Sequence, residues 1–347
     1  MTSFRPAVAL GSQRRLSALG SLVLGALLVI ASVSTAIAQT RALIVTGLGA
    51  EPKYQQEFRS LGARLSSALA TKYGIPAANI AWLGEDSTNA SKMYKGRSTA
   101  QNIMREIDRL SAAAKPNEQI LIVLIGHGSG TGEDTKFNIP GPDISAKDLS
   151  VALSRFAAQR VAFLDLTTAS GDVLPLLSLP NRIVVTATKS GYERNESQFA
   201  RFFVEALDKD GAADVDKDGR VSLLEAYRYA AQETRKSYAS DERMQTEHSQ
   251  LDDDGNGKGS DLPDGRNAGD GLLSRRFFLD AGVATRQASS DPRVNKLYSD
   301  KFAIEDQIDA LKQRKASLKE DAYYAELETL LVSLAKLPRE IRLAEGR

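Results

Sequence analysis

The sequence predicts an α/β fold in which helices cover both faces of a mainly parallel sheet. Over residues 41–208, short apolar runs rich in β-branched residues alternate with segments whose apolar residues recur at helical spacing. The apolar runs are continuous and do not alternate with polar residues, which is typical of strands buried on both faces. Because strands separated by helices form βαβ units, we expect three layers with the sheet in the middle.

The predicted strands and helices follow one another in a regular order. Strands are expected at residues 42–46, 80–83, 120–125, 161–166 and 182–186. Helices are expected at residues 54–73, 98–113, 149–158 and 197–208. Ser98 is the expected N-cap of the second helix, and Ser145 forms a capping box with Asp148 before the third. In such sheets ligands bind beyond the carboxyl ends of the strands, so we expect the site in the loops after these strands.

Residues 1–38 are predicted to be a signal peptide that is cleaved after Ala38. Basic residues precede an apolar run over residues 16–33, and the triplet Ala36-Ile37-Ala38 fits a signal-peptidase site. The alternative is an uncleaved membrane anchor, because the apolar run is nearly long enough to span a bilayer. We therefore expect a secreted or periplasmic protein, which contacts a membrane only if this segment is retained.

The composition excludes several classes of protein. The 45 basic and 44 acidic residues nearly cancel, so no general attraction to nucleic acid is expected. The chain has no cysteine, which rules out disulfides, a thiolate nucleophile and a lipid-modified N-terminal cysteine. The two histidines, His127 and His248, are too few for a zinc site without cysteine. An exported domain of this kind needs another means of stabilisation, and a metal ion bound by oxygen ligands is one.

Two of the predicted strands are followed by residues suited to a nucleophile–base pair. The third strand leads into His127 and Gly128, and the fourth leads into Thr168 and Ser170. A histidine after one buried strand and a nucleophile after the next is an arrangement that brings the pair together on a parallel sheet. The alternative for His127 is a structural role in a tight glycine loop, with its ring bonded to the backbone.

These motifs resemble those of the legumain-type cysteine peptidases, a family related to caspases. The resemblance covers residues 41–208. Residues 126–129 are similar to the family's His-Gly segment, residues 144–149 to the stretch after it, residues 166–171 to its Glu-Ala-Cys-x-Ser-Gly block, and residues 185–188 to the strand that follows. The resemblance implies a three-layer α/β/α fold of caspase/legumain type. It also implies a substrate cleft that includes Gln55, Gln56, Gly128 and Ser170.

The sequence departs from the family's pattern at the residues that carry the chemistry. Thr168 takes the position of the catalytic cysteine, and Leu166 takes that of an acidic residue. Gln55 and Gln56 stand where the family has a substrate-binding Arg-His pair. A threonine hydroxyl must lose its proton to a base during attack, whereas a cysteine thiolate is already anionic. We therefore expect the pair of His127 and Thr168 to be inactive and the family's asparagine specificity to be absent.

The most complete chemical motif is a calcium-binding loop of EF-hand type at residues 214–225. Oxygen ligands stand at the positions that the twelve-residue template requires, and Gly219 permits the sharp turn at its sixth position. The expected ligands are Asp214, Asp216, Asp218, Arg220 through its carbonyl, Ser222 and Glu225. Predicted helices flank the loop, as in an EF-hand. Since an exported protein meets abundant calcium, we expect calcium as a stabilising cofactor; the alternative is a solvated acidic turn.

Residues 252–257 read Asp-Asp-Asp-Gly-Asn-Gly and form a partial second loop of the same kind. The sequence supplies oxygen ligands at the first, third and fifth positions, but the twelfth position is Pro263. A flexible acidic turn explains these residues equally well.

The chain divides into regions around this domain. Residues 39–210 form the caspase/legumain-like domain, and residues 211–290 hold the calcium loop, a helix and a region rich in Asp and Gly. Residues 291–347 are expected to form a helical, coiled-coil-like tail, whose apolar stripe is interrupted near Asp321 and at Pro338. The stripe predicts either a hairpin packed on its own domain or a surface for self-association.

Three functions fit the sequence. The first is an exported pseudopeptidase, a non-catalytic module that binds a peptide or protein and is stabilised by calcium. The second is a hydrolase that uses Thr168 or Ser170 with His127. The third is a structural protein that acts through its helical tail.

Overall fold

The computed structural model describes residues 39–86, 89–116, 118–215, 220–265, 269–279 and 291–344. The predicted signal peptide at residues 1–38 and two expected calcium ligands, Asp216 and Asp218, lie outside the described residues. Within the described ranges, no helix combines the length and the apolar character needed to cross a membrane.

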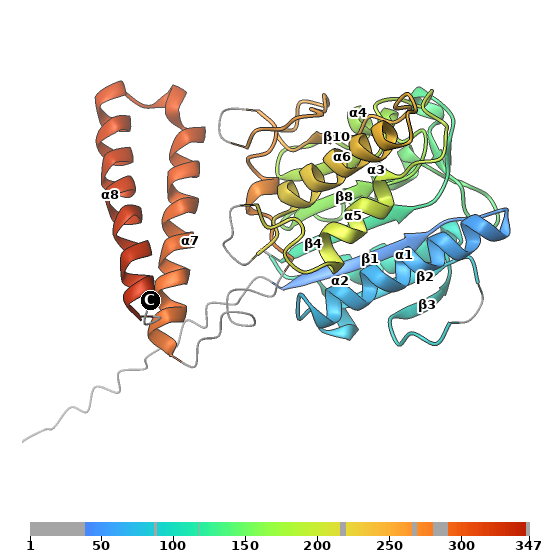
Figure 1. The fold of residues 1–347 in the computed structure, drawn as a ribbon, viewed down its shortest axis with the longest axis horizontal. Coiled ribbons are helices and arrows are strands. Elements are labelled where there is room, and N and C mark those ends of the chain that lie inside the picture. The colour runs from blue at the N-terminus through green and yellow to red at the C-terminus, as the bar shows by residue number, and fades with distance from the viewer. Residues whose placement is uncertain are drawn as a thin grey trace, which may run out of the picture. The chain divides into compact units, whose positions relative to one another are not determined.

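A seven-stranded sheet forms the middle layer of the domain (Figure 1). The strand order is β10-β9-β8-β4-β1-β2-β3, and all described neighbours are parallel except β9 and β10. The strands are β1 (Thr40–Thr46), β2 (Ile80–Gly84), β3 (Tyr94–Arg97), β4 (Gln119–Ile125), β8 (Arg160–Asp165), β9 (Arg182–Thr186) and β10 (Gln250–Asp252). The predicted mainly parallel sheet is confirmed.

Helices cover both faces of this sheet (Figure 1). One face carries α1 (Pro52–Thr71), α5 (Phe199–Asp208) and α6 (Leu223–Ser240). The other face carries α2 (Ala100–Ala113), α3 (Ala146–Leu153) and α4 (Leu174–Leu177). Because side chains alternate along a strand, Ile44 of β1 packs with the first group of helices and Val45 with the second. The predicted three-layer α/β/α arrangement is confirmed.

The N-terminus of α2 begins one residue later than the sequence predicts. Thr99 is the N-cap, and its side chain accepts a hydrogen bond from Asn102 N at 3.3 Å. The Ser98 hydroxyl donates instead to Thr46 O at 2.8 Å. Ser98 therefore joins the helix start to the end of β1, and the prediction that it caps α2 is wrong.

The capping box at the start of α3 is confirmed. Ser145 Oγ accepts a hydrogen bond from Asp148 N at 3.1 Å, and Asp148 Oδ2 accepts one from Ser145 N at 3.2 Å. The helix ends at Leu153, earlier than predicted. Tight backbone hydrogen bonds close its last turn, and Phe156 then turns into the core.

The prediction missed both edge strands of the sheet. β3 is short and polar, with Lys95 and Arg97 exposed. β10 has three residues, which pair with β9. Neither strand has the continuous apolar run that identifies a strand buried on both faces.

A small antiparallel sheet follows β4 and begins where the carboxyl end of β4 leaves the main sheet. Its strands are β5 (Gly128–Ser129), β6 (Lys136–Phe137) and β7 (Ile144–Ser145). Short 3₁₀ turns complete the described structure: η1 (Ala77–Asn79), η2 (Gly132–Asp134), η3 (Gly171–Val173), η4 (Ser274–Arg276) and η5 (Lys315–Ser317).

The C-terminal region is a helical hairpin, so the predicted helical tail is confirmed. α7 (Pro292–Gln313) and α8 (Glu320–Ala344) pack against each other (Figure 1). Arg314 pairs with Glu326 at 3.3 Å across the turn. Among the hairpin side chains that the structure describes, the buried apolar ones are Val294, Ile308, Leu311, Tyr323, Leu337 and Ile341.

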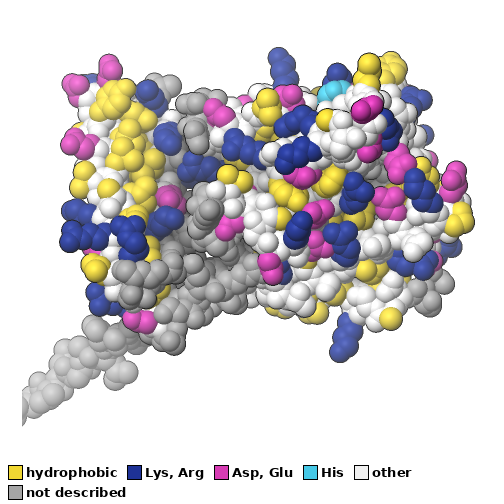
Figure 2. All heavy atoms as spheres, viewed as in Figure 1, with side chains coloured by type: hydrophobic (Ala, Val, Ile, Leu, Met, Phe, Trp, Pro, Cys, Tyr) yellow, Lys and Arg dark blue, Asp and Glu magenta, His cyan; other side chains and the backbone are white. Residues whose placement is uncertain are grey.

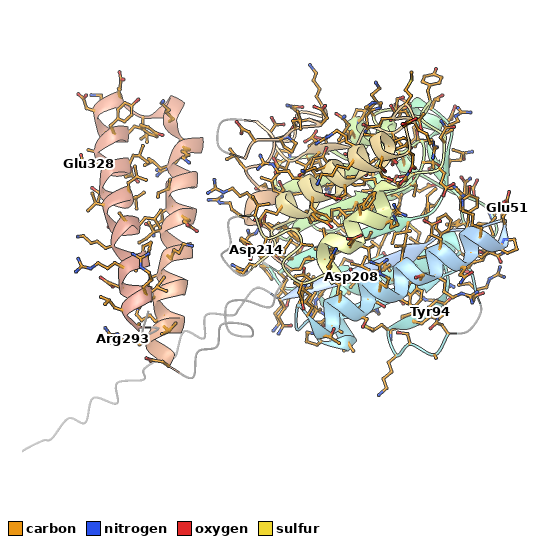
Figure 3. The ribbon with its side chains drawn as sticks, viewed as in Figure 1. Glu51, Tyr94, Asp208, Asp214, Arg293 and Glu328 are labelled. Carbon is orange, nitrogen blue, oxygen red and sulfur yellow. The ribbon has the colours of Figure 1, made fainter. Side chains whose placement is uncertain are left out.

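Part of the apolar surface of the hairpin is exposed. Tyr324 is 49% exposed and Leu331 is 47% exposed, and they share a helix face because two turns separate them. Figure 2 shows a band of hydrophobic side chains along the hairpin, and Figure 3 shows the charged positions Arg293 and Glu328 on its two helices. Self-association through this region stays a prediction.

Candidate functional site

The loops after β1, β4 and β8 lie at one edge of the sheet, because these strands are parallel neighbours. Gly47 N donates to Ile125 O at 2.8 Å, which joins the first two loops. A Cβ atom on Gly128 would lie 2.3 Å from Thr168 O, so only glycine permits this approach of the second and third loops. The structure therefore brings Gly128 and Thr168 together.

The hydroxyl of Thr168 is bonded to the loop that carries the histidine. Its Oγ1 accepts a hydrogen bond from Gly128 N at 3.2 Å and donates one to Gly128 O at 3.4 Å. The residue is only 4% exposed. The hydroxyl proton of Thr168 is therefore directed at the carbonyl of Gly128. The N–H of Gly128, a backbone donor of the kind that stabilises an oxyanion, is already bonded to the same hydroxyl.

The ring of His127 packs against aromatic side chains of α1. Its centroid lies 4.7 Å from that of Tyr54 and 5.1 Å from that of Phe58, both in edge-to-face geometry. Among the described residues, no hydrogen bond reaches the ring, neither from Thr168 nor from the backbone. Burial lowers the pKa of His127, and the opposing effect of Glu196 is smaller. Burial therefore favours the uncharged imidazole.

His127 and Thr168 line one small pocket between α1 and the segment that leads into α5. Its interior has a volume of about 10 Å³, close to the space that one water molecule needs. Burial raises the pKa of Glu57, and the charge of Glu196 raises it further. The pocket is therefore narrow, with aromatic walls and two carboxyl groups. The other lining residues are Tyr54, Phe58, Leu61, Gly126, Leu166, Ser197 and Ala200.

The other expected cleft residues do not line this pocket. Ser170 is 1% exposed, and its Oγ accepts hydrogen bonds from the backbone amides of residues 187 and 188 at 3.1 and 3.3 Å. Gln55 Nε2 donates to Glu85 Oε1 at 3.2 Å beside a neighbouring hollow, and Gln56 is exposed. Ser170 therefore ties the loop after β8 to the loop after β9 and does not face a substrate.

A buried carboxyl group at the end of β8 was missed by the sequence analysis. Asp165 is 3% exposed and accepts hydrogen bonds from Thr167 Oγ1 at 2.6 Å and from Thr167 N at 3.2 Å. Burial raises the pKa of Asp165 to about 7, although these hydrogen bonds oppose the rise. The signal in the sequence is a single acidic residue inside an otherwise apolar strand.

Asp165 is expected to make the protein less stable as the pH rises. Its pKa rises from 3.8 to about 7 on folding, so between these values the folded state binds more protons than the unfolded state. The free energy of unfolding then falls with rising pH, by at most about 1.4 kcal/mol per pH unit for this group. Asp165→Asn removes this slope. Urea unfolding at several pH values between 4 and 7 measures it, and a wild-type-to-variant difference that does not change with pH would contradict the assignment.

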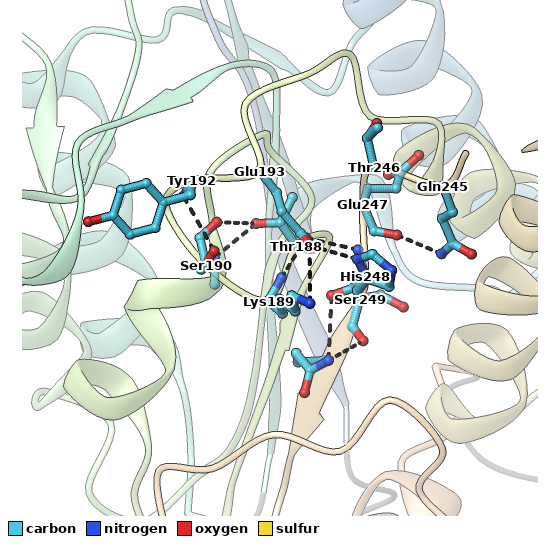
Figure 4. A network of polar contacts seen from close by, with 12 residues as sticks. Thr188, Lys189, Ser190, Tyr192, Glu193, Gln245, Thr246, Glu247, His248 and Ser249 are labelled. Atoms are coloured by element: carbon cyan, nitrogen blue, oxygen red, sulfur yellow. Dashed lines mark hydrogen bonds and ion pairs between the residues drawn. The ribbon is translucent and has the colours of Figure 1, made fainter. Parts of the chain in front are cut away.

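His248 belongs to a polar network (Figure 4). Its Nδ1 lies 2.6 Å from Glu193 Oε1, and its backbone N donates to Glu193 Oε2 at 2.9 Å. The same Oε2 accepts a hydrogen bond from Lys189 N at 3.0 Å. Glu193 O in turn accepts one from the amide of Ala169, the residue after Thr168, at 2.8 Å. The network therefore holds the loop that carries Thr168.

The described part of the predicted calcium loop presents oxygen atoms between α5 and α6. Figure 3 labels Asp214 in this loop, and its Oδ1 is buried. Glu225 Oε2 accepts hydrogen bonds from Ser222 N at 2.9 Å and from Ser222 Oγ at 2.8 Å, and its Oε1 accepts one from Val215 N at 3.0 Å. The side chains of the described candidate ligands thus offer hydroxyl and carboxylate oxygens, which are donor types that calcium prefers, and Arg220 is the described candidate for a carbonyl ligand.

A second segment supports this loop from the side. Leu223 N donates to Phe277 O at 2.9 Å, and Ser222 pairs with Phe278 in an isolated antiparallel bridge. The guanidinium of Arg220 lies 3.6 Å from the centroid of the Phe278 ring. Residues 277–278 therefore fix the end of the loop at the start of α6.

Comparison with known proteins finds solved structures of low similarity to this chain. No family model and no curated protein matches the chain. The solved structures that resemble it include protein GSU0716 from Geobacter sulfurreducens, with 11% identity and a TM-score of 0.38 over 56% of this chain and 89% of that one. The Drosophila initiator caspase Dronc has 11% identity and a TM-score of 0.39 over 65% and 83%. The structure of drICE has 12% identity and a TM-score of 0.35 over 58% and 84%.

Proposed function

We propose that this chain is an exported pseudopeptidase of legumain-type ancestry, a non-catalytic module that binds a peptide or protein. The observation that carries the proposal is the Thr168 hydroxyl, which bonds to Gly128 N and Gly128 O and not to His127. Attack by a threonine requires a base that removes its proton. The histidine ring instead packs between Tyr54 and Phe58, so it does not serve as that base.

The chemistry of the pocket favours a ligand with a basic side chain. Lys53 already places an ammonium group at the rim, where its Nζ lies 2.9 Å from Glu196 Oε2 and 4.9 Å from the centroid of the Tyr54 ring. A carboxylate beside an aromatic ring is a favourable environment for a cation. A lysine or arginine of a peptide ligand would replace Lys53 beside Glu196 and Tyr54 at the rim, and Glu57 is a further acidic residue that lines the pocket.

Calcium at the loop of residues 214–225 is the proposed stabilising cofactor. The ion would be held by Asp214, Arg220 through its carbonyl, Ser222 and Glu225 among the described residues, together with the expected ligands Asp216 and Asp218. Bound calcium would supply the link between α5 and α6 that disulfides supply in other exported proteins. Export itself is proposed from the signal peptide at residues 1–38.

The purified protein is expected to bind basic peptides without cleaving them. One assay follows cleavage of a peptide library by the wild type, by Thr168→Ala and by His127→Ala, and we expect no turnover in any of them. A second measures binding of fluorescent peptides that carry lysine at one position, with norleucine peptides as the comparison. Glu196→Gln should weaken lysine-dependent binding about fivefold, equivalent to about 1 kcal/mol. Lys53→Met should strengthen it by freeing Glu196.

The control for the charge change is Glu133→Gln, which removes an exposed carboxylate that pairs with Lys147 away from the pocket. It should leave peptide binding unchanged. Cleavage that is lost in both Thr168→Ala and His127→Ala would replace this proposal with the hydrolase alternative. Equal binding of the lysine and norleucine peptides would refute the basic-ligand pocket.

A further inference from the structure

The acidic loop after β10 acquires an additional carboxylate from a distant part of the chain. In the sequence, residues 252–257 lack the acidic residue that should close a calcium loop. In the structure, carboxylate oxygens of Asp252, Asp254 and Asp270 all lie within 4.8 Å of one another. Asp270 thus adds a third carboxylate to a loop whose linear motif has Pro263 at its twelfth position, although its place in the sequence does not suggest this.

The fold holds Asp270 in this position through Asp253, the residue between the two loop carboxylates. Asp253 N donates to Asp270 Oδ1 at 3.0 Å. The Asp253 side chain accepts hydrogen bonds from Gly271 N at 2.8 Å and from Ser274 N at 2.7 Å. Since Asp253 is only 6% exposed, these bonds are shielded from water. The segment that carries Asp270 is therefore fastened directly to the acidic loop.

One oxygen in this cluster is buried without a partner. Asp252 is 0% exposed, and its Oδ1 accepts a hydrogen bond from Gly255 N at 3.1 Å. Its Oδ2 is also buried and has no partner at hydrogen-bond geometry among the residues that the structure describes, although polar groups of Ser178 and Gly257 lie nearby. Burying a carboxylate oxygen without a hydrogen-bond partner costs folding free energy. This cost indicates that a positively charged partner is missing.

No side chain of the described residues supplies that positive charge. None of the described Lys, Arg or His side chains forms an ion pair with Asp252, Asp254 or Asp270. Oxygen atoms of these three carboxyl groups approach one another within 4.8 Å. The like charges repel one another, and a cation among them would relieve this repulsion.

We propose that Asp252, Asp254 and Asp270 form a second calcium site, separate from the loop of residues 214–225. Calcium binds oxygen ligands at about 2.3–2.6 Å, so two ligands on opposite sides of the ion are about 5 Å apart, which the cluster matches. All the donors of this cluster are carboxylate oxygens, whereas zinc prefers the sulfur of Cys and the nitrogen of His. The ion ties β10 to the segment that begins at Asp270.

The site is tested by the number of calcium ions that the full-length protein binds. Isothermal titration of calcium into chelator-treated protein should give two sites in the wild type and one in Asp270→Asn. Asp252→Asn should also give one site. The Glu225→Gln variant separates the two loops, because it should lose the other site and keep this one. The double variant Asp270→Asn with Glu225→Gln should bind no calcium at either site.

Matched controls keep the result interpretable. Asp261→Asn removes one exposed carboxylate from the same region and should bind as the wild type does. If Asp270→Asn does not fold, Asp254→Asn replaces it, because Asp254 is exposed and, among the described residues, its side chain accepts hydrogen bonds from Asn256 alone. Unchanged stoichiometry in folded Asp254→Asn and Asp270→Asn would overturn the proposal. A wild type that binds one ion, lost in Asp270→Asn and kept in Glu225→Gln, would support this site and reject the other loop.

Discussion

Removal of calcium from the loop of residues 214–225 is expected to lower the free energy of unfolding by about 2.7 kcal/mol. This value applies when the calcium concentration before removal is about a hundredfold above the dissociation constant of the loop. The loop forms only in the folded chain, so the ion binds the native state and not the unfolded one. Glu225→Gln weakens the carboxylate that closes the loop and should abolish this increment, leaving only the contribution of the proposed site at Asp252, Asp254 and Asp270. Thermal melts in calcium and in chelator measure it, and the melting temperature should fall by roughly 5–10 °C.

The same variant has a second effect that must be separated from metal loss. Glu225 accepts hydrogen bonds from Ser222 and Val215, so Glu225→Gln also weakens the start of α6 by about 1 kcal/mol without calcium. The informative quantity is therefore the difference between the two melts of each protein. Glu233→Gln is the matched control on α6, because its ion pair among the described residues is with the exposed Lys236. Identical wild-type melts in calcium and in chelator would reject the cofactor.

Loss of Glu247 is expected to destabilise the domain by about 3–4 kcal/mol. Its carboxylate is 2% exposed and caps the N-terminus of α5. Oε2 accepts hydrogen bonds from Ser197 Oγ at 2.6 Å and from Phe199 N at 3.2 Å, and Oε1 accepts one from Gln198 N at 2.7 Å (Figure 4 labels Glu247 beside His248). Glu247→Ala leaves these buried donors unpaired at the positive end of the helix.

Two comparisons isolate the cause of this loss. Glu247→Gln keeps one accepting oxygen and should cost less than half as much as Glu247→Ala. Glu233→Ala removes a more exposed carboxylate and should change stability by less than about 1 kcal/mol. Urea unfolding gives the free energies. Equal costs for the alanine variants at positions 247 and 233 would show that Glu247 is not an important cap.

The central strands and the pairing of two loops could be predicted from the sequence, because both depend on local patterns. Continuous apolar runs identify strands buried on both faces, and parallel neighbours bring Gly128 and Thr168 to the same edge. The capping of α5 by Glu247 and the proximity of Asp270 to Asp252 could not be predicted. These contacts join segments that are far apart in the chain, and no period or motif in the sequence records which carboxylate meets which donor.

The orientation of the Thr168 hydroxyl could not be predicted from the sequence either. The motif placed a possible nucleophile near a histidine, but hydrogen-bond geometry decided which partner the hydroxyl takes. A change from sulfur to a β-branched alcohol alters the preferred rotamer as well as the acidity, and the sequence specifies neither outcome.

The two edge strands of the main sheet affect how readily the protein aggregates at high concentration. At one edge, β3 presents the exposed charges of Lys95 and Arg97. At the other, Leu251 of β10 exchanges both backbone hydrogen bonds with Ser260, at 2.9 Å each, so its outer side is partly covered. A strand from another molecule therefore finds neither edge open and apolar, and growth of aggregates by strand addition is disfavoured.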